Sequence, residues 1–507
     1  MNSSLRTNAS AAALSPMAQG ATPAAPHGTP AAVSQRTGPT STAAALPARH
    51  EAFPAQIYRA RREQLLQRMR ASGGGVAVLR TAAEQLRNRD ADHAFRHDSY
   101  FYYLTGFTEP GAALVLDGRH GVEGAPAHIL FCREKNAERE VWEGRRLGPV
   151  DAVAALGVDA ALPIDALDAQ MTELLANAPA LYYPVGATPT LDEDAQRWLA
   201  SVRARGRSGL QAPGTLIDLL PALDDMRVVK DRHEQDLMRR AARISAAAHR
   251  RAMRACRPGM REYEIEAELL YEFRRSGAQA PAYGSIVAAG ENACVLHYPA
   301  GDAIARDGDL VLIDAACELD GYASDITRTF PANGRFSAPQ RALYDIVLAA
   351  QQAAADATRP GAHFDTPHDA AVRVLVQGMF DTGLLQAGRD GDVEQAIAQR
   401  SYSRFYMHRT GHWLGMDVHD CGDYFDRDGN ATSAGAAPLS RTLVPGMVLT
   451  IEPGLYVRPG PDVPEQYWNI GIRIEDDAIV TADGCELITR DVPVAAAAIE
   501  ALMREGK

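Results

Sequence analysis

Two aspartates flank a hairpin pattern in the middle of the chain. The apolar run Leu310–Ile313 leads to Asp314, Asp320–Gly321 is typical of a two-residue turn, and Asp325 opens an alternating segment. In that register Asp325 pairs opposite Ala316, so both aspartates share a face as diagonal neighbours, roughly 7–8 Å apart. Two such carboxylates repel unless one takes up a proton or a cation lies between them. A divalent metal ion commonly balances such a pair. Taken alone, the pair would also be explained by one aspartate that caps a turn and one that is a solvated strand residue.

Three histidines are concentrated in the segment MHRTGHWLGMDVHD, which carries His408, His412 and His419. The first two have the spacing of a helical zinc pair. However, Arg409 stands where the metalloprotease motif has glutamate, and Gly411 disfavours a helix. The helical zinc interpretation is therefore rejected, and a structural role stays open for any single histidine of the three.

Two glutamates extend this set of polar residues. Glu452 ends the strand-like run 448–451, and Glu475 shares one face of an alternating segment with Arg473. Acidic ligands with a single imidazole favour hard or borderline dications, with Mn²⁺ above Zn²⁺. Shared carboxylates favour two metals about 3.5–4 Å apart, an arrangement that produces hydroxide near neutral pH. The pattern therefore favours hydrolysis, while a turn residue at 452 and a solvated sheet face at 473–475 remain open.

The elements that must position these residues fall into two halves. Residues 1–52 are rich in Ala, Ser, Thr, Pro and Gly and are predicted to form a disordered leader. Strands alternating with helices over 53–225 predict an α/β domain. The predicted strands are 76–79, 100–104, 113–116, 128–131 and 181–183, and the predicted helices are 58–69, 150–156 and 191–203.

Longer helices mark the second half, 226–507. They are predicted at 231–256, 262–277, 338–357 and 366–384, around the aspartate hairpin and before the histidine segment. Residues 425–440 are small and polar and are predicted to form a surface loop that could influence substrate length preference.

Bulk properties limit the partners. The chain has 507 residues, a formal charge of −12 and a pI near 5.6, which argue against nucleic acid or an anionic membrane as the main partner. No apolar run is long enough to span a membrane. Six cysteines without a Cys-x-x-Cys spacing indicate free thiols in a reducing compartment. We therefore expect a cytoplasmic protein, with organelle targeting by the leader as a minor alternative.

Several segments together resemble aminopeptidase P, the Xaa-Pro aminopeptidase of the pita-bread metallopeptidase family. They are GDLVLIDAACELDGYASDITRTFP, HRTGHWLGMDVHD, PGMVLTIEPGLY, NIGIRIEDD, ENACVLHYP, CRPGM, FRHDSYFYYLTGFTEP and VWEGRRLGP. The resemblance runs from about residue 53 to the end. It implies an α+β protein, in which a C-terminal pita-bread catalytic domain follows a creatinase-like α/β N-terminal domain. It also implies a homo-oligomer, dimer or tetramer, in which Asp90 is a candidate cross-subunit contact.

The resemblance also implies roles for individual residues. Two divalent ions, most readily Mn²⁺, would be held by Asp314, Asp325, His412, Glu452 and Glu475, with Asp325 and Glu475 bridging them. Glu452 would also shuttle a proton. The other catalytic residues would be His297, His408 and His419, which together with Arg473 would also bind substrate.

The implied activity is release of the first residue from peptides with proline second, by attack of a hydroxide that bridges the metals. An Xaa-Pro dipeptidase (prolidase) would use the same ligands, although the LHYP and HRTGHWLG segments fit aminopeptidase P better. Methionine aminopeptidase usually lacks so large an N-terminal domain. A metal-free pita-bread binding module or a non-metal amidinohydrolase would lack ligand carboxylates, whereas all five ligand positions are filled here.

Overall fold

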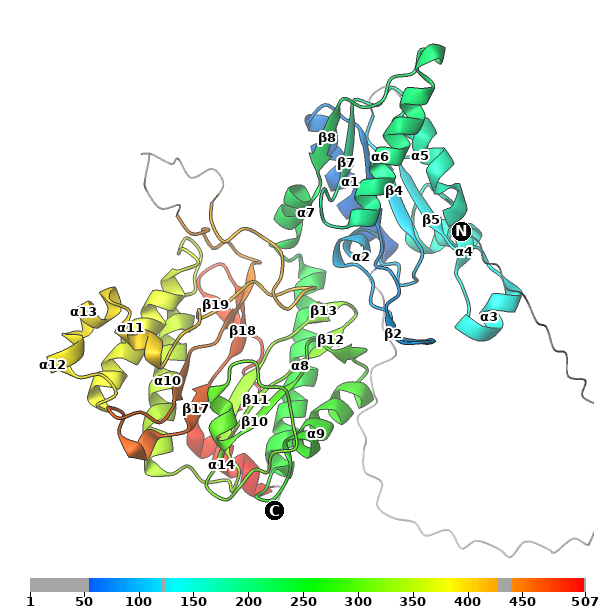
Figure 1. Cartoon of the computed structure of the whole chain (residues 1–507). Helices are drawn as coiled ribbons and strands as arrows, with labels where there is room; N and C mark the ends of the chain where they lie inside the picture. The colour runs from blue at the N-terminus through cyan, green and yellow to red at the C-terminus, as the bar shows by residue number, and fades with distance from the viewer. Residues whose placement is uncertain (1–53, 120–123, 427–438, 506–507) are drawn as a thin grey trace, which may run out of the picture. The chain divides into compact units, whose positions relative to one another are not determined.

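The computed structural model describes residues 54–119, 124–426 and 439–505 (Figure 1). The predicted leader at 1–52 and most of the predicted loop at 425–440 lie outside these residues. Within the described part, no helix has both the length and the apolar character that a membrane crossing requires. None of the six cysteines, all of which are described, forms a disulfide.

The first half is organised around a six-stranded mixed sheet in the order β6-β5-β4-β1-β7-β8. Its central strands are buried on both faces. One face packs against α5 and α6 through Met171 and Trp198, and the other against α1 through Leu66. The elements are α1 (Ala55–Ala71), β1 (Val76–Arg80), β4 (Ala113–Asp117), β5 (His128–Cys132), α4 (Gly148–Leu156), β6 (Ala160–Pro163), α5 (Leu167–Leu175), β7 (Ala180–Tyr183), α6 (Pro189–Ala204) and β8 (Thr215–Asp218).

One predicted strand, 100–104, is wrong, because these residues form helix α2 (Ser99–Thr105). The run of aromatic residues favours a strand locally. Signals at both ends override that preference. The Asp98 side chain caps the helix by accepting from the Phe101 backbone N–H at 2.8 Å, and Gly106 ends it in the left-handed conformation. The aromatic side chains lie on all sides of this short helix and are largely buried. The sequence therefore shows no apolar face with the period of a helix.

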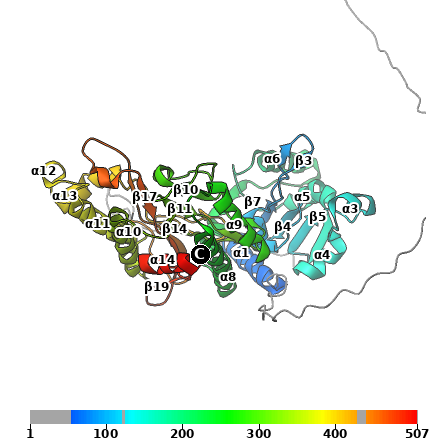
Figure 2. The same cartoon turned by 90° about the horizontal axis from the view of Figure 1, so that it is seen from below.

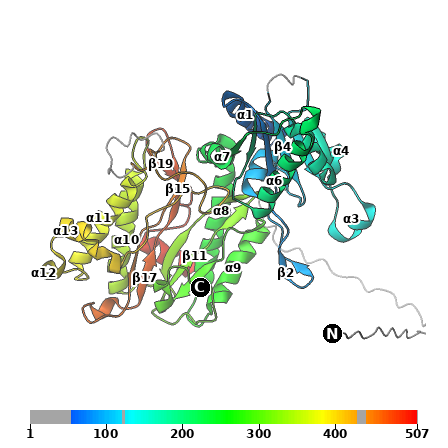
Figure 3. The same cartoon turned by 45° about the horizontal axis from the view of Figure 1, so that its top comes forward.

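The second half places curved strands between two helix pairs (Figures 1 and 2). Helix α8 (Arg232–Ala255) lies along α9 (Glu262–Arg275), and α10 (Ala338–Ala357) lies along α11 (Thr366–Asp381), in agreement with the predicted helices. The strands between them are β10 (Ile286–Ala289), β11 (Leu310–Asp314), β14 (Thr327–Pro331), β15 (Val448–Ile451), β16 (Gly454–Val457), β17 (Ile470–Arg473) and β18 (Asp476–Val480). Figure 3 shows the same layering from another side.

Shorter elements complete the described part. They are β2 (Leu86–Asn88), β3 (Ala91–Asp92), α3 (Ala137–Glu143), α7 (Leu220–Arg227), β9 (Ala280–Pro281), β12 (Cys317–Leu319), β13 (Tyr322–Ala323), α12 (Ala387–Asp390), α13 (Val393–Ala398), β19 (Cys485–Leu487) and α14 (Ala496–Glu505). The helix and sheet content agrees with the α+β prediction, while the domain boundary near residue 225 stays a prediction.

The aspartate hairpin has the register predicted from its turn. Asp320 and Gly321 both have positive φ, 49° and 78°, as a two-residue hairpin turn requires. Leu319 pairs with Tyr322 next to the turn, and five residues further along Asp314 pairs with Thr327 in the same register, although in a separate sheet. The hairpin therefore delivers both aspartates to the same end of the sheet.

A buried histidine supports this hairpin from behind. The His249 ring on α8 is fully buried, and its Nε2 lies 2.8 Å from the carbonyl oxygen of Ala315, beside Asp314. The carbonyl can only accept, so Nε2 carries the proton. Burial lowers the pKa of His249 to about 4. The folded chain therefore keeps this ring neutral at pH values where an unfolded chain would protonate it.

We expect acid to destabilise the fold through His249. The unfolded histidine takes up a proton near pH 6.5, whereas the folded one does so only near pH 4. Between these values its contribution to the free energy of unfolding falls by about 1.4 kcal/mol per pH unit, and above pH 6.5 it does not vary. His249→Gln keeps a donor for the carbonyl but cannot titrate.

Urea unfolding at several pH values between 7 and 4.5 measures this difference. The free energy of unfolding should fall less steeply in His249→Gln than in the unmodified protein. His233→Gln, at an exposed position on the first turn of the same helix, is the matched control. Equal slopes for the unmodified protein and His249→Gln would contradict the assignment.

Candidate metal centre and active site

A cavity of about 1010 Å³ opens at the aspartate hairpin. Its wall includes every residue singled out above as a metal, catalytic or substrate-binding candidate, namely His297, Asp314, Asp325, His408, His412, His419, Glu452, Arg473 and Glu475. Asp90 is not among the lining residues. It lies in the exposed turn between β2 and β3, so its cross-subunit role stays a prediction.

The two aspartates converge on a tyrosine that the sequence did not reveal. The Tyr283 hydroxyl lies 2.6 Å from Asp314 Oδ1 and 2.5 Å from Asp325 Oδ1. One hydroxyl has one proton to donate, so it cannot satisfy two carboxylates fully. The backbone N–H of Asp325 donates to a further buried carboxylate, Asp477, at 3.1 Å. Nothing in the sequence around Tyr283 distinguishes it from a core tyrosine.

His412 lies in an extended segment beside β15. The Thr450 backbone N–H donates to the His412 carbonyl at 2.9 Å, which fixes the backbone. In the ring, Nδ1 lies 2.9 Å from the Trp413 carbonyl and donates to it. The other ring nitrogen, Nε2, therefore faces the acids, 3.5 Å from Asp325 Oδ2 and 3.7 Å from Glu452 Oε1. Such a backbone contact is a common way to orient a metal-binding imidazole.

Two glycines allow this segment to pack closely. A Cβ atom on Gly411 would lie 2.1 Å from the carbonyl oxygen of Thr450, and one on Gly415 would lie 2.2 Å from Asp420 Oδ2. Neither position has room for a side chain. The segment is not helical, in agreement with the rejection of a helical zinc pair.

The two glutamates reach the cavity from neighbouring strands. Glu452 follows β15 directly, and Glu475 lies between β17 and β18, where Thr327 Oγ1 donates to its Oε2 at 2.6 Å. One ligand atom each of Asp325, His412 and Glu475 lies within 4.8 Å of the others, a spacing suitable for a metal ion. Carboxylates with one imidazole form a donor set that divalent ions accept.

Without a cation, three of the acids in this cluster hold their protons more tightly than free carboxyl groups do. Burial, together with the neighbouring acids, raises the pKa of Glu475 well above its ordinary value, and burial raises that of Glu452 to about 7. Burial also raises the pKa of Asp325. Burial would lower the pKa of His412, but the hydrogen bond to Asp325 and the charge of Glu452 raise it to about 9. Without a cation, protons on these groups therefore offset part of the repulsion, and a bound cation would take their place.

Arg473 makes its hydrogen bonds to the protein. Its guanidinium donates to Asp314 Oδ2 at 2.6 Å, to Thr327 Oγ1 at 3.1 Å and to the Tyr456 hydroxyl at 3.0 Å. It is 4% exposed, so little of it faces the cavity. These contacts support a role in holding Asp314 and Tyr456, and the predicted contact with substrate remains a prediction.

The remaining histidines surround the acidic cluster. His408 Nε2 lies 2.8 Å from the Tyr456 hydroxyl, and burial, with the charge of Arg473, lowers the pKa of His408 to about 4. The rings of His412 and His419 are 4.1 Å apart. His297 enters from the loop that follows the 3₁₀ helix Gly290–Cys294. Tyr456, like Tyr283, was not identified from the sequence.

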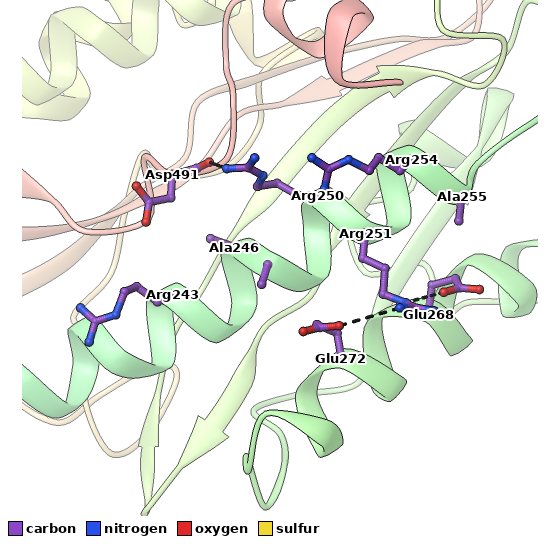
Figure 4. Close-up of a pocket in the computed structure, with 10 residues that line it drawn as sticks. Arg243, Ala246, Arg250, Arg251, Arg254, Ala255, Glu268, Glu272 and Asp491 are labelled. Atoms are coloured by element: carbon purple, nitrogen blue, oxygen red, sulfur yellow. Dashed lines mark hydrogen bonds and ion pairs between the residues drawn. The ribbon is translucent and has the colours of Figure 1, made fainter. Parts of the chain in front are cut away.

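A second hollow, of about 800 Å³, lies on the outer side of α8 and α9 (Figure 4). Arginines line it, and Arg251 is paired with Glu268 at 2.5 Å and with Glu272 at 4.0 Å. It contains none of the candidate residues. The convergence of acids and imidazoles therefore places the candidate site in the larger cavity.

Comparisons with known proteins show the family to which the chain belongs. Residues 58–182 match the family model "Aminopeptidase P, N-terminal domain", and residues 236–482 match "Metallopeptidase family M24". The chain is 44% identical over 451 residues to the Xaa-Pro aminopeptidase of Escherichia coli K12, covering 88% of this chain and 97% of that protein.

Solved structures give the same result. Aminopeptidase PepP of Pseudomonas aeruginosa is 47% identical and superposes with a TM-score of 0.84, covering 90% of this chain and 99% of that one. Zinc-substituted Escherichia coli aminopeptidase P in complex with product is 43% identical and superposes with a TM-score of 0.83, covering 89% and 99%.

The fold and the matched models define a metallopeptidase of family M24 with an N-terminal aminopeptidase P domain, joined to a pita-bread catalytic part. The identity over most of both chains makes the assignment more particular. The chain belongs to the Xaa-Pro aminopeptidases and is a hydrolase of the exopeptidase type.

We expect removal of the buried Arg473 charge to destabilise the protein when no metal is bound. Arg473→Met leaves Asp314 without its counter-charge inside an acidic cluster, and breaking a buried pair costs about 3–5 kcal/mol. Urea unfolding measures this loss of stability. A chelator is present because bound metal would add stability by mass action.

Arg458→Met is the matched control. Arg458 is exposed just beyond β16 and makes a hydrogen bond to the Cys294 carbonyl at 2.7 Å. Its removal should cost less than about 1 kcal/mol. If both variants lost the same stability, the buried pair would not have the importance assigned to it.

Proposed function

We propose that this enzyme releases the N-terminal residue of peptides that have proline in the second position, and that it does so with two divalent ions, most readily Mn²⁺. The single observation that carries the proposal is the convergence of four carboxylates and one imidazole in one cavity, in an M24 metallopeptidase. The ligands would be Asp314, Asp325, His412, Glu452 and Glu475, with Asp325 and Glu475 shared between the ions. When bound, such ions lower the pKa of water and stabilise negative charge on a carbonyl oxygen.

The chain's own residues would handle the protons. Glu452 has a pKa raised to about 7 by burial, which suits a group that takes a proton from the attacking water and passes it to the leaving nitrogen of proline. His408 lies 3.7 Å from Glu452 Oε2 through its Nδ1 and is bonded to Tyr456 through Nε2. This position supports a role for His408 beside the developing oxyanion.

Substrate binding would involve the remaining wall of the cavity. His297 and His419 lie on the rim, and apolar side chains such as Ile286, Leu296 and Phe364 line the same space. A proline ring needs an apolar surface of this kind. The cavity volume of about 1010 Å³ supports peptides longer than a dipeptide. A dimer or tetramer, with Asp90 at a subunit contact, remains part of the proposal.

The ligand assignment predicts a distinct pattern of metal content. His412→Ala and Glu475→Ala should each lose bound metal and lower activity by more than roughly 100-fold, since ligands act as a unit. His408→Ala should lower turnover while metal is retained. Elemental analysis after dialysis against Mn²⁺, with activity measured on the same samples, checks this pattern. Loss of metal in His408→Ala would show that the wrong histidine was assigned.

The substrate assignment predicts selectivity by sequence and by length. An Xaa-Pro-Xaa tripeptide should be cleaved after its first residue, and the matched Xaa-Ala-Xaa tripeptide should be cleaved at least roughly tenfold more slowly. Activity should disappear with a chelator and return with Mn²⁺. Chromatography of the released amino acid provides the measurement. A preference for the Xaa-Pro dipeptide would instead support a prolidase.

A further inference from the structure

A buried charge cluster lies directly behind His419. The Asp420 carboxylate accepts from Arg227 at 2.7 Å through one oxygen and from Lys230 Nζ at 2.9 Å through the other. Each of these three side chains is only 1% exposed. Arg227 comes from α7 and Lys230 from the segment before α8, so the carboxylate ties the histidine segment to the connection between the two halves of the chain.

The cluster continues into the start of α2. Arg227 also donates to Asp417 at 2.9 Å, and Asp417 accepts from the Ser99 hydroxyl at 2.7 Å. Arg96 donates to the Met416 carbonyl at 2.7 Å. Residues just before and within α2, in the first half of the chain, therefore contact the segment that carries His419 at two points.

The geometry of this segment depends on Asp420. Its backbone N–H donates to the Trp413 carbonyl at 2.9 Å, and its Oδ1 accepts from the Asp417 backbone N–H at 3.3 Å. The segment thus closes around the carboxylate, and Gly415 leaves room for it. Removal of the carboxylate charge would weaken its contacts with Arg227, Lys230 and the Asp417 N–H together.

The His419 side chain packs against another ring, and its backbone continues directly into Asp420. The residue is exposed, whereas Asp420 beside it is buried. Within residues 54–119, 124–426 and 439–505, no hydrogen bond fixes the His419 imidazole, whose closest ring neighbour is His412. The position of the imidazole therefore depends on this ring contact and on the backbone that Asp420 anchors.

Stability alone gives a poor explanation of the cluster. Burying two cations and a carboxylate carries a desolvation cost that their attraction offsets only approximately, and apolar residues of similar volume often serve as well. Charged groups do fix a geometry more closely than apolar contacts, because each hydrogen bond has a direction. The Arg227 guanidinium is further confined by the Tyr100 ring, at 4.4 Å from its centre.

We propose that Asp420, held by Arg227 and Lys230, is a positioning residue that aims His419 into the cavity, and that Ser99 and Arg96 extend this control to the first half of the chain. The proposal rests on the substrate-handling role given to His419 above. Asp420 touches no substrate and acts only through its neighbour.

A double-mutant cycle tests the proposal. Asp420→Asn should lower kcat/KM for an Xaa-Pro-Xaa tripeptide by roughly 10- to 100-fold, because small displacements of a substrate-positioning group have effects of this size. In a His419→Ala background the same change should alter kcat/KM less than about twofold. Bound Mn²⁺ should be unchanged, because the His412 backbone is held by the Thr450 N–H of β15 independently of the Asp420 side chain.

Glu234→Gln is the matched control. Glu234 is also buried and paired, with Arg61 at 3.3 Å and the Tyr322 hydroxyl at 2.8 Å, but it is not adjacent to His419. Its effect on kcat/KM should be the same with and without His419. Histidine NMR gives a readout independent of activity, because the resonance lost in His419→Ala should shift in Asp420→Asn and stay in place in Glu234→Gln.

Equal losses of kcat/KM from Asp420→Asn in both backgrounds, or an unmoved His419 resonance, would overturn the proposal. If Asp420→Asn does not fold, Ser99→Ala removes one outer contact and should show the same dependence on His419 with a smaller, severalfold effect. Failure of the proposed function gives a different result, since the unmodified protein would then not cleave the Xaa-Pro-Xaa tripeptide, while the NMR spectrum of Asp420→Asn would still report on His419.

Discussion

Repulsion between buried carboxylates is the constraint on which the rest of the structure depends. Asp314, Asp325, Glu452 and Glu475 face one cavity, and Asp477 lies directly behind Asp325. Acids at this density cannot all be charged unless cations balance them. The hairpin, the strand ends and the close packing at the glycines all serve to keep these groups together against that repulsion.

Within the acidic cluster, positive charge comes from two kinds of group. Arg473 is permanently charged and is fixed by three hydrogen bonds, so it holds Asp314 in place. His412 changes its charge. Without a cation it is protonated, because its pKa is raised to about 9, whereas a cation would require its neutral form. Protonated His412 thus balances part of the negative charge before a metal binds. The metal would balance that charge afterwards.

The sequence predicted the parts of the site that are marked by local chemistry. The Asp320–Gly321 turn predicted the hairpin register, the strand end at 451 pointed to Glu452, and the alternating segment pointed to Glu475. Tyr283 and Asp477 could not be found in this way, since they meet Asp325 only through tertiary packing. The strand predicted at 100–104 failed because the cap at Asp98 outweighed the aromatic residues. Partners that lie far apart in the chain leave no local pattern.

The absence of space at Gly411 and Gly415 has a consequence for protein engineering. A library that randomises the histidine segment would return only glycine at these two positions, because even one added carbon meets an oxygen atom about 2.1–2.2 Å away. Variation intended to broaden the range of accepted peptides belongs elsewhere in the cavity lining, at Ile286 or Leu296. Phe364 is less suitable, because its ring packs at 4.6 Å on that of Trp413, next to His412.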